Sequence, residues 1–409
     1  MALVVGEPEG VNEDSGVASQ EILIVGGGIG GVAAALALCR QGRKVTVLER
    51  APEFKEVGAG LQMAPNATRI LRSWGVLDQV LEMGVQPKRL IFRDAVTGEQ
   101  LTDADLRGEF AERYGAPYVV LHRSDLHAIL VEAARKAGAD LRTNADVVDV
   151  ETRDDVARVR TSDGTVYRAD VVLGIDGLTS SLRRKVSGDE VVASGYVAYR
   201  GAIPMDEALD VDDRENVVVY LGPECHMVQY PLRAGTMFNT VAVFKSPSFS
   251  RGEFVPADQQ ELQNAYSDCI PQVQRALLNL WKTVSWPMYD REPIDNWVDG
   301  RMLLMGDAAH PMLQYLAQGA CQAIEDADAF DRISASVTDP HEWNAALAEF
   351  NSTRADRTAR VQRTARTWGE AWHVNTPLPK LLRNLLFKSR KDEDTRYTDW
   401  LYGADSIST

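Results

Sequence analysis

The chain has 409 residues, 45% of them hydrophobic and 25% charged, and its formal net charge is −15. This length exceeds what one small core needs and predicts two closely packed domains. The negative charge argues against nucleic acid or an anionic membrane as the main partner, because both repel an acidic surface. Residues 1–20 are acidic and polar, without a basic start or an apolar core, which predicts a disordered tail and not a signal peptide.

A glycine pattern lies between two apolar runs near the start of the chain. Residues 22–25 predict a buried strand, Gly26-x-Gly28-x-x-Gly31 opens an alanine-rich helix, and a second apolar run ends on Glu49. In a β-α-β unit, Gly26 permits a tight turn, Gly28 lets the backbone approach a pyrophosphate, and Gly31 lets helix and strand pack closely. Glu49 can hold a ribose hydroxyl. We therefore expect a bound adenine dinucleotide.

Residues 22–39 are uncharged and nearly as long as a membrane span. The glycine cluster would break such a helix and leave backbone groups unsatisfied in lipid, so we expect no integral membrane segment. The cysteines are far apart and the histidines scattered, which predicts no metal site and reduced thiols in a cytoplasmic protein. The cysteines are Cys39, Cys225, Cys269 and Cys321.

Further elements are expected along the chain from hydrophobic spacing and turn residues. In the first half of the chain, residues 64–80 have helical spacing that ends near Gly75, a second helix runs from an N-cap at Ser124 to about Lys136, and a hairpin turn follows at 162–165. A buried strand then ends at Asp176 and Gly177, and an antiparallel sheet is expected over 195–245. A strand from Arg301 to Asp307 and helices over 319–333 and 343–372 complete the chain. Arginines recur every three residues in the last helix, which predicts a solvated face or a dimer contact. They are Arg354, Arg357, Arg360, Arg363 and Arg366.

Three patterns occur together in the chain. The glycine motif is followed by Asp176-Gly-Leu-Thr-Ser-Ser-Leu-Arg183 and then by Gly306-Asp307-Ala-Ala-His310-Pro311. Alone, Asp-Gly is usually a turn and Gly-Asp a strand end with a helix cap. In this order and spacing, the chain resembles the single-component FAD-dependent aromatic hydroxylases over nearly its whole length.

The resemblance implies an α/β fold: an FAD-binding Rossmann-like domain of the p-hydroxybenzoate hydroxylase type, an inserted antiparallel-sheet substrate domain and C-terminal helices. The implied FAD-binding segments are residues 21–82, 108–190 and 290–340, the substrate segments are 83–107 and 191–289, and the helical region is 341–409. The implied FAD contacts are Gly26, Gly28, Gly31, Glu49, Arg50, Arg123, Asp176 and Asp307. There is one glycine fingerprint, so a nicotinamide cofactor would have no domain of its own.

Within this family the chain resembles most the 3-hydroxybenzoate 6-hydroxylases, through residues 222–233, 286–294, 313–317 and 397–401. That resemblance implies 2,5-dihydroxybenzoate (gentisate) as product, formed with transient NADH and O₂ through a C4a-hydroperoxyflavin. The choice of NADH over NADPH rests on the resemblance alone. Decarboxylating salicylate or hydroxynicotinate hydroxylation is the nearest alternative, although many such relatives carry proline where this chain has Gln314. An FAD-dependent dehydrogenase, a halogenase and a non-enzymatic FAD-fold binder are more distant alternatives.

The reaction favours a phenolate, which needs a base with a pKa near neutrality beside the phenol. By resemblance, His226 and Gln314 are the catalytic residues, and Tyr230 and Tyr118 bind the substrate. Tyr230 lies four residues after His226, so both face the same side of a strand, as residues of an ordinary core also would. Met312, Leu313 and Leu316 would exclude water, His310 is expected to be structural, and we expect a homodimer.

Overall fold

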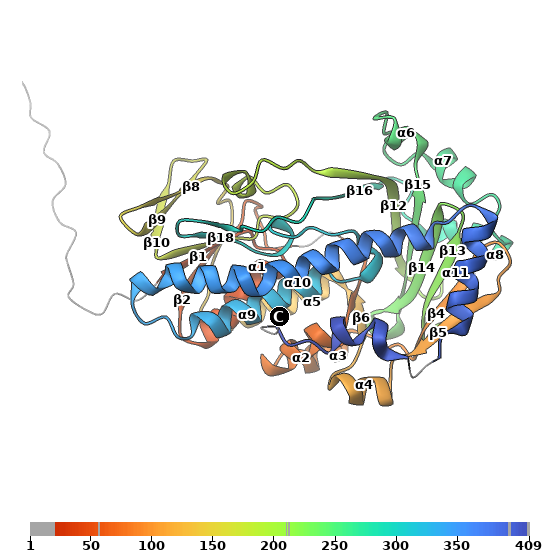
Figure 1. The fold of residues 1–409 in the computed structure, drawn as a ribbon, viewed down its shortest axis with the longest axis horizontal. Coiled ribbons are helices and arrows are strands. Elements are labelled where there is room, and N and C mark those ends of the chain that lie inside the picture. The colour runs from red at the N-terminus through yellow and green to blue at the C-terminus, as the bar shows by residue number, and fades with distance from the viewer. Residues whose placement is uncertain (1–20, 56–57, 210, 212, 392–393, 407–409) are drawn as a thin grey trace, which may run out of the picture.

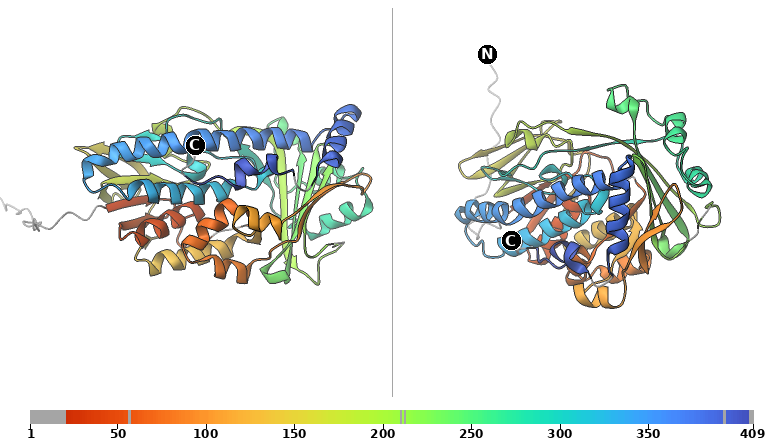
Figure 2. Two further views of the ribbon diagram at one scale, coloured as in Figure 1. Left: turned by 60° about the horizontal axis from the view of Figure 1, so that its bottom comes forward. Right: turned by 45° about the vertical axis from the view of Figure 1, so that its right-hand side comes forward.

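The computed structural model describes residues 21–55, 58–209, 211, 213–391 and 394–406 (Figure 1). The tail predicted for residues 1–20 lies outside the described residues. A helix-covered parallel sheet forms one end of the molecule and a seven-stranded sheet forms the other. The long helix α10, Trp343–Trp372, runs past both, as the two further views also show (Figure 2).

The first sheet has the strand order β17-β18-β11-β1-β2-β7, and its strands are parallel except for the β17–β18 pair. Apart from Glu21 at the start of β1, its central strands are apolar and buried, as expected where helices cover both faces of a parallel sheet. The β-α-β unit predicted over residues 22–49 is confirmed. The strands are β1 Glu21–Val25, β2 Lys44–Leu48, β7 Asp140–Arg142, β11 Val171–Gly174, β17 Val298–Asp299 and β18 Met302–Leu304, and the helices around α1 Ile29–Arg40 are α5 Arg123–Lys136 and α9 Gly319–Ser334.

The second sheet has the order β16-β12-β15-β14-β13-β4-β5. Neighbouring strands in this sheet are antiparallel, except for β13 and β4, which are parallel. Alternate residues point to opposite faces, and helices α6 Pro247–Ser250, α7 Gln259–Ala265 and α8 Pro271–Ala276 contribute to the core on one of them. The strands are β4 Arg89–Asp94, β5 Gln100–Asp105, β12 Val192–Pro204, β13 Val217–Gly222, β14 Cys225–Leu232, β15 Met237–Lys245 and β16 Trp286–Asp290.

Two small antiparallel sheets complete the strands. The hairpin predicted at residues 162–165 is confirmed, because it joins β9 Val156–Thr161 to β10 Val166–Ala169, and β8 Val147–Arg153 pairs with β9. Strands β3 Gly60–Met63 and β6 Val119–His122 form the other sheet. The shorter helices include α4 Glu109–Tyr114, α11 Pro377–Ser389 and α12 Asp399–Tyr402.

Two helix predictions need correction. The helix expected over 64–80 is two helices, α2 Pro65–Ser73 and α3 Leu77–Met83, because Gly75 takes a left-handed φ of +77° between them. The N-cap of α5 is His122 and not Ser124, since the His122 side chain accepts the Ser124 N–H at 3.3 Å. The bounds predicted for α10 and for the end of α5 are confirmed.

The prediction that the α10 arginines form one solvated face is wrong. A three-residue step turns a helix by about 300°, so five such residues sweep around it instead of sharing a side. Arg354 and Arg357 are paired inside the molecule, whereas Arg363 is exposed. Arg360 lies over the ring of Trp400 at 4.1 Å.

Arg354 belongs to a buried charge cluster between α9 and α10, made of Glu325, Asp326, Arg354 and Arg357. Arg354 donates to Glu325 Oε2 and Asp326 Oδ1, each at 2.7 Å. The other oxygen of Asp326 accepts the Gly306 N–H at 2.9 Å and lies 2.6 Å from His310 Nε2. His310 is therefore a buried partner of this cluster, and the cluster supports the turn that carries the Gly306-Asp307 motif.

Candidate active site

The glycine motif lies where β1 turns into α1. Gly26 has a φ of +107°, and a Cβ on it would lie 2.3 Å from the carbonyl oxygen of Ile175. A Cβ on Gly31 would lie 1.9 Å from the Gly26 carbonyl oxygen, so a larger residue does not fit there. Gly28 is the N-cap of α1 and provides no side-chain cap, which leaves the first N–H groups of the helix for a phosphate.

Glu49 and Arg50 follow β2 and line the same cavity as Gly26 and Gly28. The Glu49 carboxylate accepts the Gly27 N–H at 2.7 Å and the Ala51 N–H at 2.8 Å, one on each oxygen. Each oxygen keeps a further lone pair. Glu49 can therefore accept a ribose hydroxyl while it holds the glycine loop in place.

Two aspartates follow β11 and β18, the first and second strands on one side of β1. Asp176 Oδ2 accepts the Ser181 N–H at 3.0 Å, whereas Oδ1 is buried and has no hydrogen-bond partner among the described residues. Asp307 is exposed to the cavity on the turn after β18, and Arg123 lines the cavity from the first turn of α5. Acceptors, a cation and a free helix N-terminus are the groups that a polyhydroxylated phosphate ligand would satisfy.

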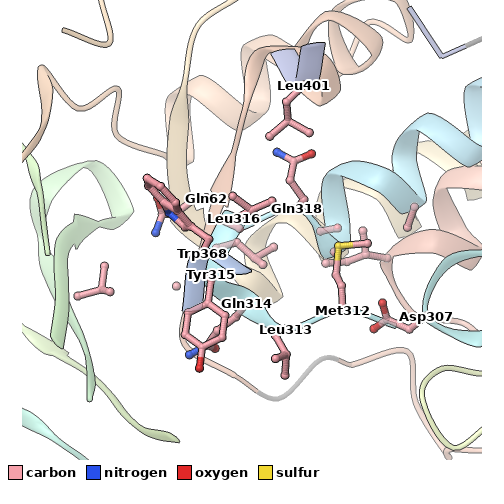
Figure 3. A pocket seen from close by; sticks show the side chains of 18 of the residues that line it. Gln62, Asp307, Met312, Leu313, Gln314, Tyr315, Leu316, Gln318, Trp368 and Leu401 are labelled. Atoms are coloured by element: carbon pink, nitrogen blue, oxygen red, sulfur yellow. The ribbon is translucent and has the colours of Figure 1, made fainter. Parts of the chain in front are cut away.

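All predicted site residues except Gly31 line one continuous cavity of about 2140 Å³. Gly31 packs behind the motif instead. Part of the wall is the loop after β18, with Asp307 and Met312 on one side of the close-up and Tyr315 on the other, near Trp368 of α10 (Figure 3). Met312, Leu313 and Leu316 contribute apolar lining from this loop.

The opposite wall is one face of the seven-stranded sheet, called here the pocket face. His226, Val228 and Tyr230 lie on it, whereas Cys225 and Met227 belong to the core on the other face. The common face predicted for His226 and Tyr230 is thus confirmed. The pocket face also includes Ala198, Arg200, Val219 and Val241.

Strand register places Arg200 opposite the middle of β14. Arg200 pairs with Val241, and Val241 pairs with Val228, which lies midway between His226 and Tyr230. At about 4.8 Å between strands, the Arg200 backbone is about 10 Å from that of Val228. A cation, an imidazole and a phenol therefore surround one patch of the pocket face.

His226 is 1% exposed, and its Nδ1 lies 2.7 Å from Nε2 of His373. Its ring also contacts Tyr315 and Trp372. Burial, and then His373, hold the pKa of His226 well below its ordinary value. This direction is opposite to the near-neutral pKa expected for the base, because burial among aromatic rings penalises an imidazolium.

Gln314 lies on a 3-10 turn, Gln314–Leu316, and its Oε1 accepts a hydrogen bond from Arg200 Nη2 at 2.8 Å. Because Oε1 accepts this bond, the amide NH₂ of Gln314 is the group that remains to donate to a ligand. Tyr118 also lines the cavity, and its hydroxyl donates to Gln62 Oε1 at 2.8 Å. Burial raises the pKa of Tyr118 well above its ordinary value, so its hydroxyl remains a donor.

Sequence reasoning missed Arg200, Gln62 and His373. Arg200 lies in the strand-like segment predicted from residue 195, so its alternation was visible. Its face relative to His226 depends on the register of three strands, which the sequence does not give. His373 directly follows α10, and no local pattern signals its contact with a residue 147 positions away.

Comparison with known proteins agrees with this geometry. A family model described as an FAD binding domain matches residues 19–365. The chain is 38% identical to 3-hydroxybenzoate 6-hydroxylase 1 of Aquipseudomonas alcaligenes, over 94% of this chain and 98% of that protein. The chain belongs to this family of FAD-dependent aromatic hydroxylases.

A second relative and one solved structure are also similar to the chain. The chain is 35% identical to 6-hydroxynicotinate 3-monooxygenase of Bordetella bronchiseptica, over 85% of this chain and 91% of that protein. Its fold matches that of Klebsiella pneumoniae HpxO, solved with FAD and uric acid, at a TM-score of 0.83 and 24% identity over 95% of this chain and 97% of that chain. The p-hydroxybenzoate hydroxylase-type fold is thereby confirmed.

FAD is the cofactor of this aromatic hydroxylase, and the residues present fit it. The unpartnered Asp176 Oδ1 and the uncapped start of α1 lie on the cavity that also contains Asp307 and Glu49. Within the described ranges, no group of three or more His, Cys, Asp or Glu side chains could hold a metal ion. In the same ranges, no helix is both long and apolar enough to cross a membrane.

Proposed function

We propose that this protein hydroxylates 3-hydroxybenzoate para to its hydroxyl group, giving gentisate, with NADH as electron donor and O₂ as oxidant. The observation that carries the proposal is the combination of Arg200, His226 and Gln314 on the cavity that contains the FAD-binding residues. Three 3-hydroxybenzoate 6-hydroxylases with 35–38% identity support the choice of substrate. NADH is proposed from the resemblance to these enzymes.

Arg200 favours an anionic substrate. No carboxylate lies within ion-pair distance of it among the described residues, and its guanidinium faces Gln314 and the ring of Trp286. Burial lowers the pKa of Arg200, which shows that its environment disfavours an unpaired cation. An aromatic carboxylate would supply the missing countercharge and can accept two parallel hydrogen bonds from a guanidinium.

The spacing along β14 suits a small aromatic acid. His226 and Tyr230 are four residues apart, a backbone distance of about 13 Å. A hydroxybenzoate with one hydrogen bond at each end spans about 12 Å, if each hydrogen bond takes about 2.8 Å. We infer that the phenol lies toward His226 and the Gln314 amide, and the carboxylate toward Tyr230 and Arg200.

The proposed roles follow from this pose. Reduced FAD, when bound, supplies the activated oxygen. His226 Nε2 accepts the phenol proton, which raises the electron density on the para carbon, and such base assistance is worth about 10²–10⁴-fold. Gln314 donates to the same oxygen, and Met312, Leu313 and Leu316 exclude the water that would release hydrogen peroxide.

The first test is NADH oxidation by the FAD-loaded protein with and without 3-hydroxybenzoate, followed by product analysis. We expect strong stimulation and gentisate. Stimulation with only peroxide would mean that 3-hydroxybenzoate is an effector, and a decarboxylated product from salicylate or 6-hydroxynicotinate would favour the alternative reaction. The His226→Ala variant should hydroxylate less and leak more peroxide while it keeps FAD, whereas loss of FAD would show a structural role for His226.

We also propose a homodimer that buries the outer face of α11. Five leucines of this helix are more than half exposed, and they recur at helical spacing on one side. They are Leu378, Leu381, Leu382, Leu385 and Leu386. Light scattering after gel filtration should give twice the chain mass for the wild type and a monomer for Leu382→Glu with Leu385→Glu, and a monomeric wild type would refute the proposal.

A further inference from the structure

His226 and His373 form a buried imidazole pair beside the cavity. Their nitrogens Nδ1 and Nε2 lie 2.7 Å apart, so one N–H is shared between the two rings. His226 lines the cavity, whereas His373 does not. The His373 ring stacks on Tyr196 at 4.3 Å between centroids and keeps 5% exposure.

A proton leaving a phenol in this pocket needs a destination. His226 is almost completely buried, and its Nδ1 lies 2.7 Å from His373, so His373 is a group that can take a proton from it. The far nitrogen of His373, Nδ1, has no hydrogen-bond partner among the described residues. The pair therefore joins the cavity to a nitrogen that lies outside the cavity lining.

We propose that His373 is a proton-relay residue that acts through His226, and this rests on the proposed function of His226 as the base. The phenol O–H bond breaks and its proton binds His226 Nε2. The proton on His226 Nδ1 moves to His373 Nε2, and the proton on His373 Nδ1 leaves to water. One proton enters and one leaves, and the reverse transfer to the product phenolate restores both tautomers.

The surroundings of the His226–His373 pair favour two neutral imidazoles that exchange tautomers over an imidazolium that holds the proton. Burial and then Arg383 lower the pKa of His373 to about 3, and the pKa of His226 is also lowered. Arg383 donates to the Trp372 carbonyl oxygen at 2.9 Å, and the aromatic rings of Tyr196, Tyr315 and Trp372 contact the pair. Both imidazoles are thus neutral, and a neutral imidazole can accept a proton on one nitrogen while it releases one from the other.

The test follows phenolate formation from bound 3-hydroxybenzoate in the oxidised FAD-loaded protein without NADH, by stopped-flow ultraviolet absorbance. His373→Gln keeps a hydrogen-bonding group near His226 but cannot relay a proton. We expect phenolate formation at least about tenfold slower, with a substrate Kd within about twofold of wild type. Imidazole should restore the rate in His373→Ala, whereas N-methylimidazole, which has no N–H to release, should not. His341→Gln, at an exposed histidine, is the matched control.

A phenolate rate in His373→Gln equal to wild type, or equal rescue by both imidazoles, would overturn the relay. A wild type that binds no hydroxybenzoate would refute the proposed function instead. The relay is then measured without substrate, by NMR of ¹⁵N-histidine-labelled protein. The shared His226 N–H should exchange with water at least about tenfold faster in wild type than in His373→Gln, and equal exchange rates would refute the relay.

Discussion

Replacing Arg354 by methionine should strongly destabilise the fold, because it leaves Glu325 and Asp326 buried without the countercharge that they share. Arg354 and both carboxylates are at most 1% exposed, and Arg354 donates to each at 2.7 Å. Burial alone raises the pKa of Asp326, yet His310 and Arg354 bring it below its ordinary value. Breaking such a pair from one side costs about 3–5 kcal/mol.

At about 2.1 cal/mol/K per residue, unfolding 409 residues gives an entropy of roughly 0.9 kcal/mol/K, so Tm should fall by about 3–6 °C. Arg363→Met is the matched control, because Arg363 lies on the same helix but is exposed, and it should shift Tm by less than about 1 °C. The assay is differential scanning calorimetry with FAD present. Equal Tm values for the two variants would refute the argument that the buried carboxylates need Arg354 as their countercharge.

Three further predictions concern the cofactor, pH and substrate. Gly31→Ala should abolish FAD binding, seen as loss of flavin absorbance after purification, whereas Gly188→Ala, with open space around its Cβ, should stay yellow. Burial raises the pKa of Asp189, but Arg183 lowers it to about 2. An aspartate in the unfolded chain has a pKa of about 3.9. The Arg183–Asp189 pair therefore stabilises the fold by about 2 kcal/mol above pH 4, and this stabilisation is lost as the pH falls toward 2. Chemical denaturation should show that difference between wild type and Asp189→Asn at pH 6, and a difference reduced to about 0.4 kcal/mol near pH 2, where Asp189 is half protonated in the folded state. Arg200→Met should weaken 3-hydroxybenzoate binding about 10–100-fold in a flavin-absorbance titration, and an unchanged Kd would remove Arg200 as the carboxylate partner.

Local features were readable from the sequence where one segment is sufficient to define them. The bounds of α10 and the strand–glycine–helix unit follow from hydrophobic spacing and from glycines that the backbone requires. The split between α2 and α3 was missed because the apolar spacing continues across Gly75. The arginine spacing was misread because a period of three does not keep residues on one helix face.

The sequence by itself determined the FAD-binding frame and the family, since motif order and spacing are properties of the chain. It also determined that His226 and Tyr230 share a face, because alternation along one strand is local. Only the tertiary structure decided that Arg200 contacts Gln314, 114 residues away, and that His226 pairs with His373. These contacts depend on strand register and on where α10 ends against the sheet, and neither is encoded within a single segment.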